Sequence, residues 1–115
     1  MSDCVFCRIV AGEIPAKVAA RTDEAVAIHD LNPQAPIHLL VVPVRHLAAV
    51  RDASGEEGAL MLGRLMQFAA GLARDLGLDP GGYRLVTNTG ADGGQSVFHL
   101  HVHLLGGRRM SWPPG

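Results

Sequence analysis

The chain has 115 residues, 48% of them hydrophobic, and a formal net charge of −1 at pH 7, so we expect one globular domain over residues 1–115. This composition excludes a disordered chain, and the charge excludes a strongly basic surface for nucleic acid or an anionic membrane. Neither a signal peptide nor a run of roughly 20 apolar residues is evident, so we expect a cytoplasmic protein with no nucleic-acid or membrane partner.

The N-terminal half is predicted to form a short helix and three strands. Asp3 is in position to cap the helix, and Gly12 is expected to end it. The third strand is nearly all apolar, which predicts burial on both faces, and Pro43 within it indicates a sheet edge or a strand end. The elements in order are a helix over 4–11, strands over 18–21 and 25–29, a loop over 30–36, and a strand over 38–44.

The C-terminal half begins with the one long helix, of about 23 residues by its periodicity. Ser54 and Glu57 form a capping-box pattern at its start, and Gly77 is expected to end it. Two strands, over 83–88 and 97–105, follow it. Its predicted apolar stripe consists of Met61, Leu65, Phe68, Leu72 and Leu76. These elements predict an α+β fold, with a five-stranded antiparallel sheet, one long helix and one short helix.

The last predicted strand contains three of the six histidines, His99, His101 and His103. Alternate residues of a strand point to the same face, so the three imidazoles are expected together on one side of the sheet. Three interpretations follow: a metal site, a solvated polar face, or catalysis on a phosphate ester or amide. The opposite face is expected to carry Phe98, Leu100, Val102 and Leu104 against a helix.

The segment Gly93-Gly94-Gln95-Ser96 directly precedes this strand. Glycine lets main-chain N–H groups approach an anion closely, and Ser96 adds a hydroxyl beside the imidazoles. Such a loop is typical of a phosphoryl site, although a plain turn also explains the two glycines.

The run His99-Leu100-His101-Val102-His103-Leu104-Leu105 resembles the signature of the histidine-triad (HIT) superfamily. Further matches resemble its Hint-like branch and extend over almost the whole chain: Ile28-His29-Asp30, Pro33-Gln34-Ala35-Pro36, Asn88, Asp92-Gly93-Gly94-Gln95-Ser96 and Trp112-Pro113-Pro114-Gly115. The resemblance implies a HIT fold, a homodimer and purine mononucleotide binding. It also implies hydrolysis of adenosine 5′-phosphoramidates to AMP and an amine, without an organic cofactor.

The same resemblance implies a role for each matching residue. His101 would attack the α-phosphorus, Ser96 would hydrogen-bond the leaving nitrogen, and His103 would hold phosphate oxygens. Asp30 would bind the ribose hydroxyls. His38 would pack beside the triad, or would be a plain core histidine. The full nucleotide-binding set implied is His29, Asp30, Leu31, Asn88, Gly94, Gln95, Ser96, His101 and His103.

The cysteines Cys4 and Cys7 have the spacing of half a zinc site. HIT relatives with this pair complete it with two histidines, which match His46 and His99 here. The resemblance thus implies a structural zinc held by these four residues, and the alternative is a thiol pair without metal.

Three other functions stay open. Dinucleoside polyphosphate hydrolases share the triad. A purine-nucleotide-binding regulatory or scaffold protein would use the same pocket with incidental hydrolysis. A catalytic zinc on the three histidines is the third.

Overall fold

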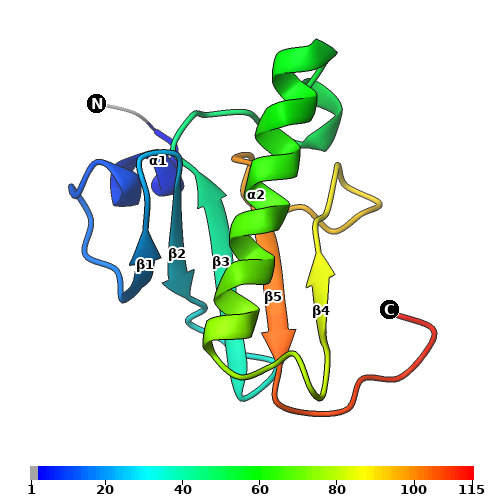
Figure 1. Cartoon of the computed structure of the whole chain (residues 1–115). Helices are drawn as coiled ribbons and strands as arrows, with labels where there is room; N and C mark the ends of the chain where they lie inside the picture. The colour runs from blue at the N-terminus through cyan, green and yellow to red at the C-terminus, as the bar shows by residue number, and fades with distance from the viewer. Residues whose placement is uncertain (1–2) are drawn as a thin grey trace.

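The computed structural model describes residues 3–115, and its centre is one five-stranded sheet in the order β1-β2-β3-β5-β4 (Figure 1). Every neighbouring pair of strands is antiparallel, so the predicted α+β class is confirmed. The elements are α1 (Val5–Val10), β1 (Val18–Arg21), β2 (Ala25–His29), β3 (Ile37–Pro43), the 3-10 turn η1 (Val50–Asp52), α2 (Gly55–Asp75), β4 (Tyr83–Val86) and β5 (Val102–Gly106).

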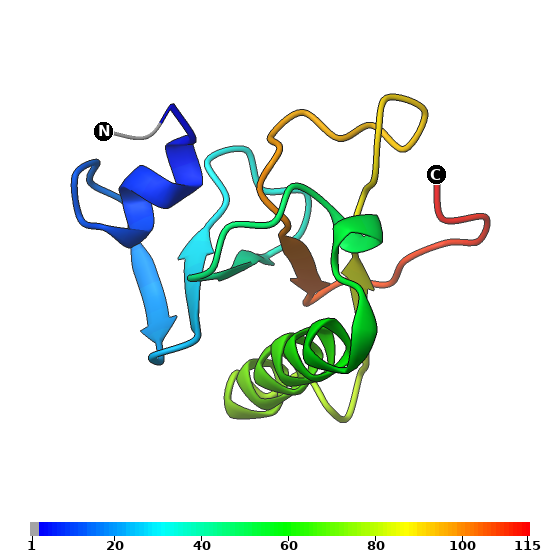
Figure 2. The same ribbon diagram turned by 90° about the horizontal axis from the view of Figure 1, so that it is seen from above.

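The two α-helices lie on opposite faces of the sheet, as the view from above shows (Figure 2). Strand β3 lies in the middle of the sheet, so its alternating side chains are covered from both sides. Leu39 and Val41 pack towards α2, whereas Leu40 and Val42 pack towards α1. The predicted burial of this strand on both faces is confirmed. No helix among residues 3–115 is both long and apolar enough to cross a membrane.

Strand β5 is shorter than predicted, because it begins at Val102 instead of residue 97. The reason lies in β3, whose ladder with β5 ends at the pair Val41–Val102. Continued in the same register, Pro43 would face Leu100, and proline has no N–H to donate. The N–H of Leu100 instead donates to Leu47 O at 2.6 Å, so the segment that carries His99 leaves the sheet.

Phe98 does not join the core under α2, contrary to the prediction, and is 59% exposed. It lies in the segment that leaves the sheet, where strand alternation no longer decides which way a side chain points. The other three residues expected on that face are buried as predicted: Leu100, Val102 and Leu104.

The two predicted helix caps differ from the observed ones in different ways. The N-cap of α1 is Cys4, not Asp3, because the Cys4 sulfur accepts the N–H of Cys7 at 3.4 Å. Ser54 is the N-cap of α2 but makes no side-chain hydrogen bond there, so the predicted capping box does not form.

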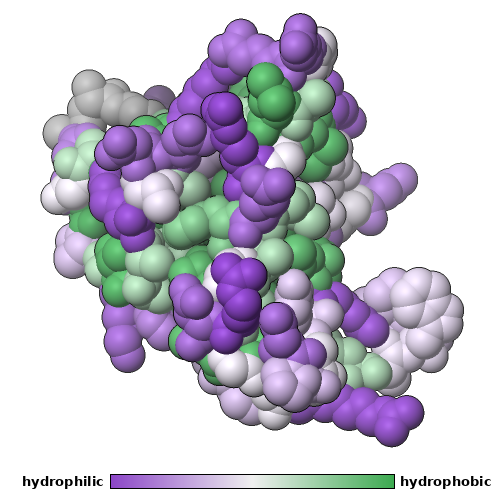
Figure 3. All heavy atoms as spheres, in the orientation of Figure 1, coloured by the Kyte–Doolittle hydropathy of each residue, from purple (hydrophilic) through white to green (hydrophobic). Residues whose placement is uncertain are grey.

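The buried stripe of α2 is narrower than the sequence pattern predicted. Leu65, Ala69 and Ala73 are fully buried against the sheet, whereas Leu76 is exposed as the helix C-cap. The small alanines let the helix approach the strands closely, and larger neighbours such as Met61 fill the sides. Along its outer face α2 carries a row of hydrophilic side chains with hydrophobic surface on either side (Figure 3).

Two leucines of α2 make a matched test of this packing. Leu65 is 3% exposed and Leu60 is 52% exposed. Replacing leucine by alanine changes the intrinsic helix propensity by the same amount at both positions, so the variants differ only in what they remove from the core. We expect Leu65→Ala to lower the free energy of unfolding by about 2–5 kcal/mol and Leu60→Ala to change it by about 0.5 kcal/mol or less. Urea unfolding curves of both variants measure this, and equal losses would contradict the observed orientation of α2.

Candidate active site and metal centre

The histidine cluster forms on the face of the sheet that α1 covers. His103 lies on β5 directly opposite Leu40 of β3, and Leu40 packs with the cluster that contains Phe6 of α1. His38, two residues before Leu40, therefore points to the same face. The ring of His103 lies 5.1 Å from that of His38 and 5.1 Å from that of His101, measured between centroids.

Hydrogen bonds determine which nitrogen of His38 carries the proton. The main-chain N–H of Gln34 donates to His38 Nδ1 at 3.0 Å, so that nitrogen must be unprotonated. The proton of the neutral ring is then on Nε2, which lies 2.9 Å from His103 Nδ1 and 3.4 Å from Asp30 Oδ2. His38 therefore donates to His103, and the remaining proton of His103 is on its Nε2.

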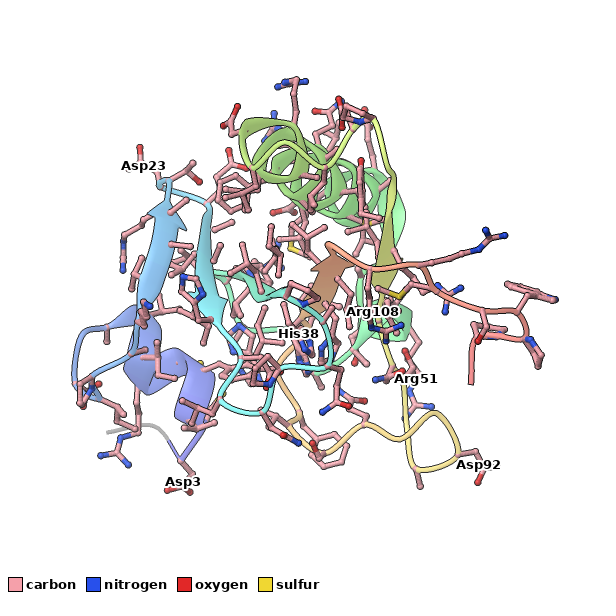
Figure 4. All side chains as sticks on the ribbon, turned by 90° about the horizontal axis from the view of Figure 1, so that it is seen from below. Asp3, Asp23, His38, Arg51, Asp92 and Arg108 are labelled. Carbon is pink, nitrogen blue, oxygen red and sulfur yellow. The ribbon has the colours of Figure 1, made fainter. Side chains whose placement is uncertain are left out.

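The neutral state of these two rings follows from their surroundings. Burial lowers the pKa of His38, and the negative charge of Asp30 only partly opposes this. Burial also lowers the pKa of His103, and the neighbouring rings of His101 and His38 add to the effect. His103 thus presents an N–H donor, which suits an anionic oxygen. His38 is the predicted neighbour of the triad, not an isolated core residue, and lies at the centre of the view from below (Figure 4).

His101 has the opposite arrangement. Its Nδ1 lies 2.8 Å from the main-chain oxygen of His99, and because a carbonyl can only accept, Nδ1 carries the proton. The lone pair is then on Nε2, as a nucleophilic imidazole requires. Phe6 packs its ring edge-on against His101 with centroids 5.0 Å apart.

His99 points into a different cluster. It is fully buried, and its Nε2–H donates to Pro43 O at 2.8 Å, which leaves the lone pair on Nδ1. That nitrogen lies 3.3 Å from the sulfur of Cys4, 3.4 Å from that of Cys7 and 3.1 Å from His46 Nδ1. The sulfur of Cys7 lies 3.2 Å from His46 Nδ1.

These four groups fit a metal ion. Two thiolates and two imidazoles are a usual donor set for structural zinc, and a tetrahedral zinc would separate such donors by about 3.3–3.8 Å. The four donor atoms all lie within 4.8 Å of one another. Burial lowers the pKa of His99, which favours the neutral ring that a metal needs.

Comparison with known proteins identifies the family. The HIT domain family matches residues 11–110. An uncharacterized HIT-like protein of Synechococcus elongatus is 47% identical over 98% of this chain and 97% of its own. A 14 kDa zinc-binding protein of Brassica juncea is 44% identical over 98% of this chain and all of its own. A solved structure named HIT family hydrolase, from Legionella pneumophila, is 46% identical with a TM-score of 0.94, covering 98% of this chain and 100% of that one.

The chain belongs to the HIT family. In this HIT domain the three triad histidines do not converge on one point. The groups of side chains among residues 3–115 that could hold a metal are the two clusters that contain His99 and His103, and neither contains His101. The second cluster, Asp30 with His38 and His103, is already joined by hydrogen bonding. The arrangement therefore disfavours a catalytic zinc on the triad.

The glycine-rich loop before the triad is held by Gln95. The side-chain oxygen of Gln95 accepts the N–H of Gly90 at 2.9 Å, and its nitrogen donates to Ala48 O at 2.6 Å and to Val97 O at 3.1 Å. The side-chain amide of Gln95 thus ties the loop to Ala48 and to Val97, and its predicted contact with a nucleotide stays a prediction. Gly94 has φ +80°, a conformation that glycine adopts without strain.

The remaining predicted site residues differ in their exposure. Asp30 uses one oxygen to accept the N–H of Asn32 at 2.7 Å and turns the other towards His38. Ser96 is exposed, and Asn88, which follows β4 in the chain, is half-buried, whereas His29 and Leu31, on either side of Asp30 in the chain, are exposed. Asp92, at the outer tip of the loop, lies far from His38 (Figure 4).

Two contributors to the site were not predicted. Phe6 contacts both His99 and His101, and its place between two candidate metal-binding cysteines on a short helix was the available signal. Gln34 acts through its main-chain N–H, a group that every residue except proline has, so its identity carries no signal.

The lowered pKa values predict how stability depends on pH. The unfolded chain binds protons at His38 and His103 near the ordinary pKa of 6.5, whereas the folded protein binds them only at lower pH. Stability contributed by the neutral rings is therefore present above 6.5 and is lost as pH falls below it towards the folded pKa. We expect a smaller free energy of unfolding at about pH 5 than at about pH 7.5, measured by urea titration.

The double variant His38→Asn/His103→Asn is the control for this pH effect, since asparagine does not titrate. Its loss of stability between the same two pH values should be smaller than that of the wild type. An equal loss in the two proteins would show that other groups cause the pH dependence.

Proposed function

We propose that this HIT protein is a hydrolase that cleaves purine nucleoside phosphoramidates to AMP and an amine. The observation that carries the proposal is the opposite protonation of two adjacent rings. His101 offers a lone pair on Nε2 because its Nδ1–H is bonded to His99 O at 2.8 Å. His103 offers a proton on Nε2 because its Nδ1 accepts from His38. A nucleophile beside a donor for phosphate oxygens is what nucleotidyl transfer to a histidine requires.

In the proposed reaction, His101 Nε2 attacks the α-phosphorus and the phosphorus–nitrogen bond breaks. The amine takes up a proton from solvent as it leaves, and the resemblance gives Ser96 the hydrogen bond to that nitrogen. The nucleotidyl-imidazole is positively charged, and the carbonyl of His99 stabilises this charge through Nδ1–H. Water then attacks the phosphorus and gives up a proton, which releases AMP and restores neutral His101.

The nucleotide would lie across the exposed edge of this cluster. Asp30 has one carboxylate oxygen directed towards His38, and we propose that this carboxylate binds the ribose hydroxyls. Main-chain N–H groups at Gly94 and the side chain of Asn88 would hold the phosphate, and Leu31 with His29 would flank the purine.

The same two rings would also serve a dinucleoside polyphosphate hydrolase or a nucleotide-binding regulatory protein. Ser96 favours the phosphoramidate, since an amine leaves poorly without a proton and a hydrogen bond to its nitrogen. Polyphosphate leaving groups have no such need. Turnover of the two substrate classes by the same preparation distinguishes these functions.

His101→Asn tests the nucleophile. We expect AMP release from an adenosine phosphoramidate to fall by at least about 10³-fold, because the amide nitrogen of asparagine has no available lone pair. The matched control is Asp92→Asn at the outer tip of the loop, which should keep wild-type turnover. Undiminished turnover in His101→Asn would exclude the proposed mechanism.

We also propose that Cys4, Cys7, His46 and His99 hold a structural zinc, supported by their donor set and by the plant relatives named zinc-binding proteins. The ion would tie α1 to the loop after β3 and to the triad segment. We expect the protein to work in the cytoplasm, where reducing conditions keep both thiols available as ligands.

Metal analysis and chelation test the zinc. We expect about one zinc per chain and a chelator-induced fall in Tm on the order of 10 °C or more, because metal binding contributes to folding stability. The Cys4→Ala/Cys7→Ala variant is the control and should have a low Tm that the chelator does not change. Metal-free protein with the wild-type Tm would exclude a structural zinc.

We further propose a homodimer, as the resemblance to the Hint-like branch implies. Strand β4 supports this proposal because it lies at the end of the strand order. Its outer side thus offers main-chain groups to a second sheet.

A further inference from the structure

His99 links the two clusters through different atoms of one residue. Its ring Nδ1 belongs to the group with Cys4, Cys7 and His46. Its main-chain oxygen accepts the hydrogen bond from His101 Nδ1 at 2.8 Å. Any rotation or shift of His99 that follows a change in the first cluster would therefore move the acceptor that holds the proposed nucleophile.

The segment that carries His99 is held by single contacts and not by the ladder of the sheet. It lies before β5, and Leu100 within it is buried in the core. Its hydrogen bonds run from the side chain of Gln95 to Val97 O, from the N–H of Leu100 to Leu47 O and from the hydroxyl of Thr87 to His101 O, at 3.1, 2.6 and 2.9 Å. The ring itself is held at Nε2 by Pro43 O, so its Nδ1 partners complete the restraint.

Helix α1 adds a second connection between the clusters. The sulfur of Cys4 caps this helix, and Cys7 lies one turn further along. Phe6, between them, packs its ring edge-on against both His99 and His101, with centroids 6.0 and 5.0 Å apart. The two cysteines thus fix the helix whose aromatic ring covers the side of His101.

We propose that metal binding by this cluster positions the nucleophile: with the site filled, His99 is a positioning residue whose carbonyl keeps His101 in the Nδ1–H form with Nε2 directed at phosphorus. Without metal, the carbonyl and Phe6 are held less firmly and His101 samples other orientations and the other tautomer. The effect on turnover rests on the proposed function, whereas the effect on the ring does not.

The first test observes the ring directly. In ¹⁵N-histidine-labelled protein loaded with zinc, the NMR spectrum should show one His101 species protonated at Nδ1, with that proton protected from solvent exchange. After chelation, the protected Nδ1–H signal should be lost or should share intensity with a second tautomer. An unchanged His101 signal in metal-free, folded protein would overturn the proposal, and this measurement needs no substrate.

The second test measures turnover of an adenosine phosphoramidate. Misplacement of a reacting group by about 1 Å can cost on the order of 100-fold, so we expect metal removal to lower kcat on the order of 10- to 100-fold. Cobalt(II) added back should restore kcat, and its visible absorption reports that the same site is filled. Full kcat in metal-free protein would contradict the proposal.

Matched variants separate positioning from general loosening of α1. Val10→Ala removes apolar contact between α1 and the sheet without touching a metal ligand, and it should keep the His101 signal and kcat within about twofold. Loss of both in Val10→Ala would assign the effect to helix docking alone. The Cys4→Ala/Cys7→Ala variant of the chelation test is compared with Val10→Ala. If that double variant does not fold, His46→Ala, which removes an exposed ligand outside α1, takes its place.

The two proposals fail in different ways. A zinc-loaded protein with no turnover on any nucleoside phosphoramidate would exclude the proposed function, and the NMR comparison would still decide whether metal positions His101. An active protein whose His101 signal and kcat are the same with and without metal would exclude only the positioning role.

Discussion

The hydrogen bond from His101 Nδ1 to the main-chain oxygen of His99 determines what the site can do. Three imidazoles with alternating positions in the sequence are chemically alike until a partner occupies one nitrogen of each. The carbonyl leaves His101 with a lone pair on Nε2, and the proton from His38 leaves His103 with a donor on Nε2. Pro43 O leaves His99 with a lone pair on Nδ1, facing the cysteines. One sequence motif thus presents three differently prepared rings, which suit the proposed nucleophile, the proposed N–H donor to phosphate oxygens and the proposed metal ligand.

The fold allows the three histidines to differ because the pairing of β3 with β5, in the middle of the sheet, ends before His99 and His101. Pro43 cannot donate a hydrogen bond, so β5 begins only at Val102 and the segment before it is free to turn His99 towards α1. Beyond that point His103 stays in the sheet, where β3 places His38 beside it. The same proline provides the carbonyl that orients the His99 ring. A residue that interrupts a strand therefore also sets the tautomer of His99, a proposed metal ligand.

Much of the fold could be predicted from local patterns in the sequence. The apolar run of β3, the turn between β1 and β2 and the periodicity of α2 all depend on neighbours in the chain, and all were predicted correctly apart from their end residues. The start of β5 was not, because it depends on which residue of β3 lies opposite Leu100. For a similar reason Asp3 is not the N-cap of α1 and Ser54 makes no capping hydrogen bond, since a suitable side chain does not ensure that the backbone presents its N–H groups to it.

The candidate site, like the fold, could be predicted from the sequence only in part. The side chains that meet, His38, His101, His103 and the four metal-site residues, were all identified in advance, largely through the family resemblance. The groups that give them their different properties are main-chain atoms of Gln34, Pro43 and His99, which carry no signature in the sequence. The contact of Phe6 with two histidines depends on how α1 docks, which sequence periodicity over one short helix does not determine.

The most direct test of the different roles of the three triad histidines is a crystal structure of the protein with AMP bound. We expect His101 Nε2 to face the phosphorus, His103 Nε2 to lie within hydrogen-bonding distance of a phosphate oxygen, and His99 Nδ1 to be turned away into the cysteine cluster. A phosphate whose phosphorus is approached by His103 or His99 instead, with His101 Nδ1 no longer bonded to the His99 carbonyl, would contradict it.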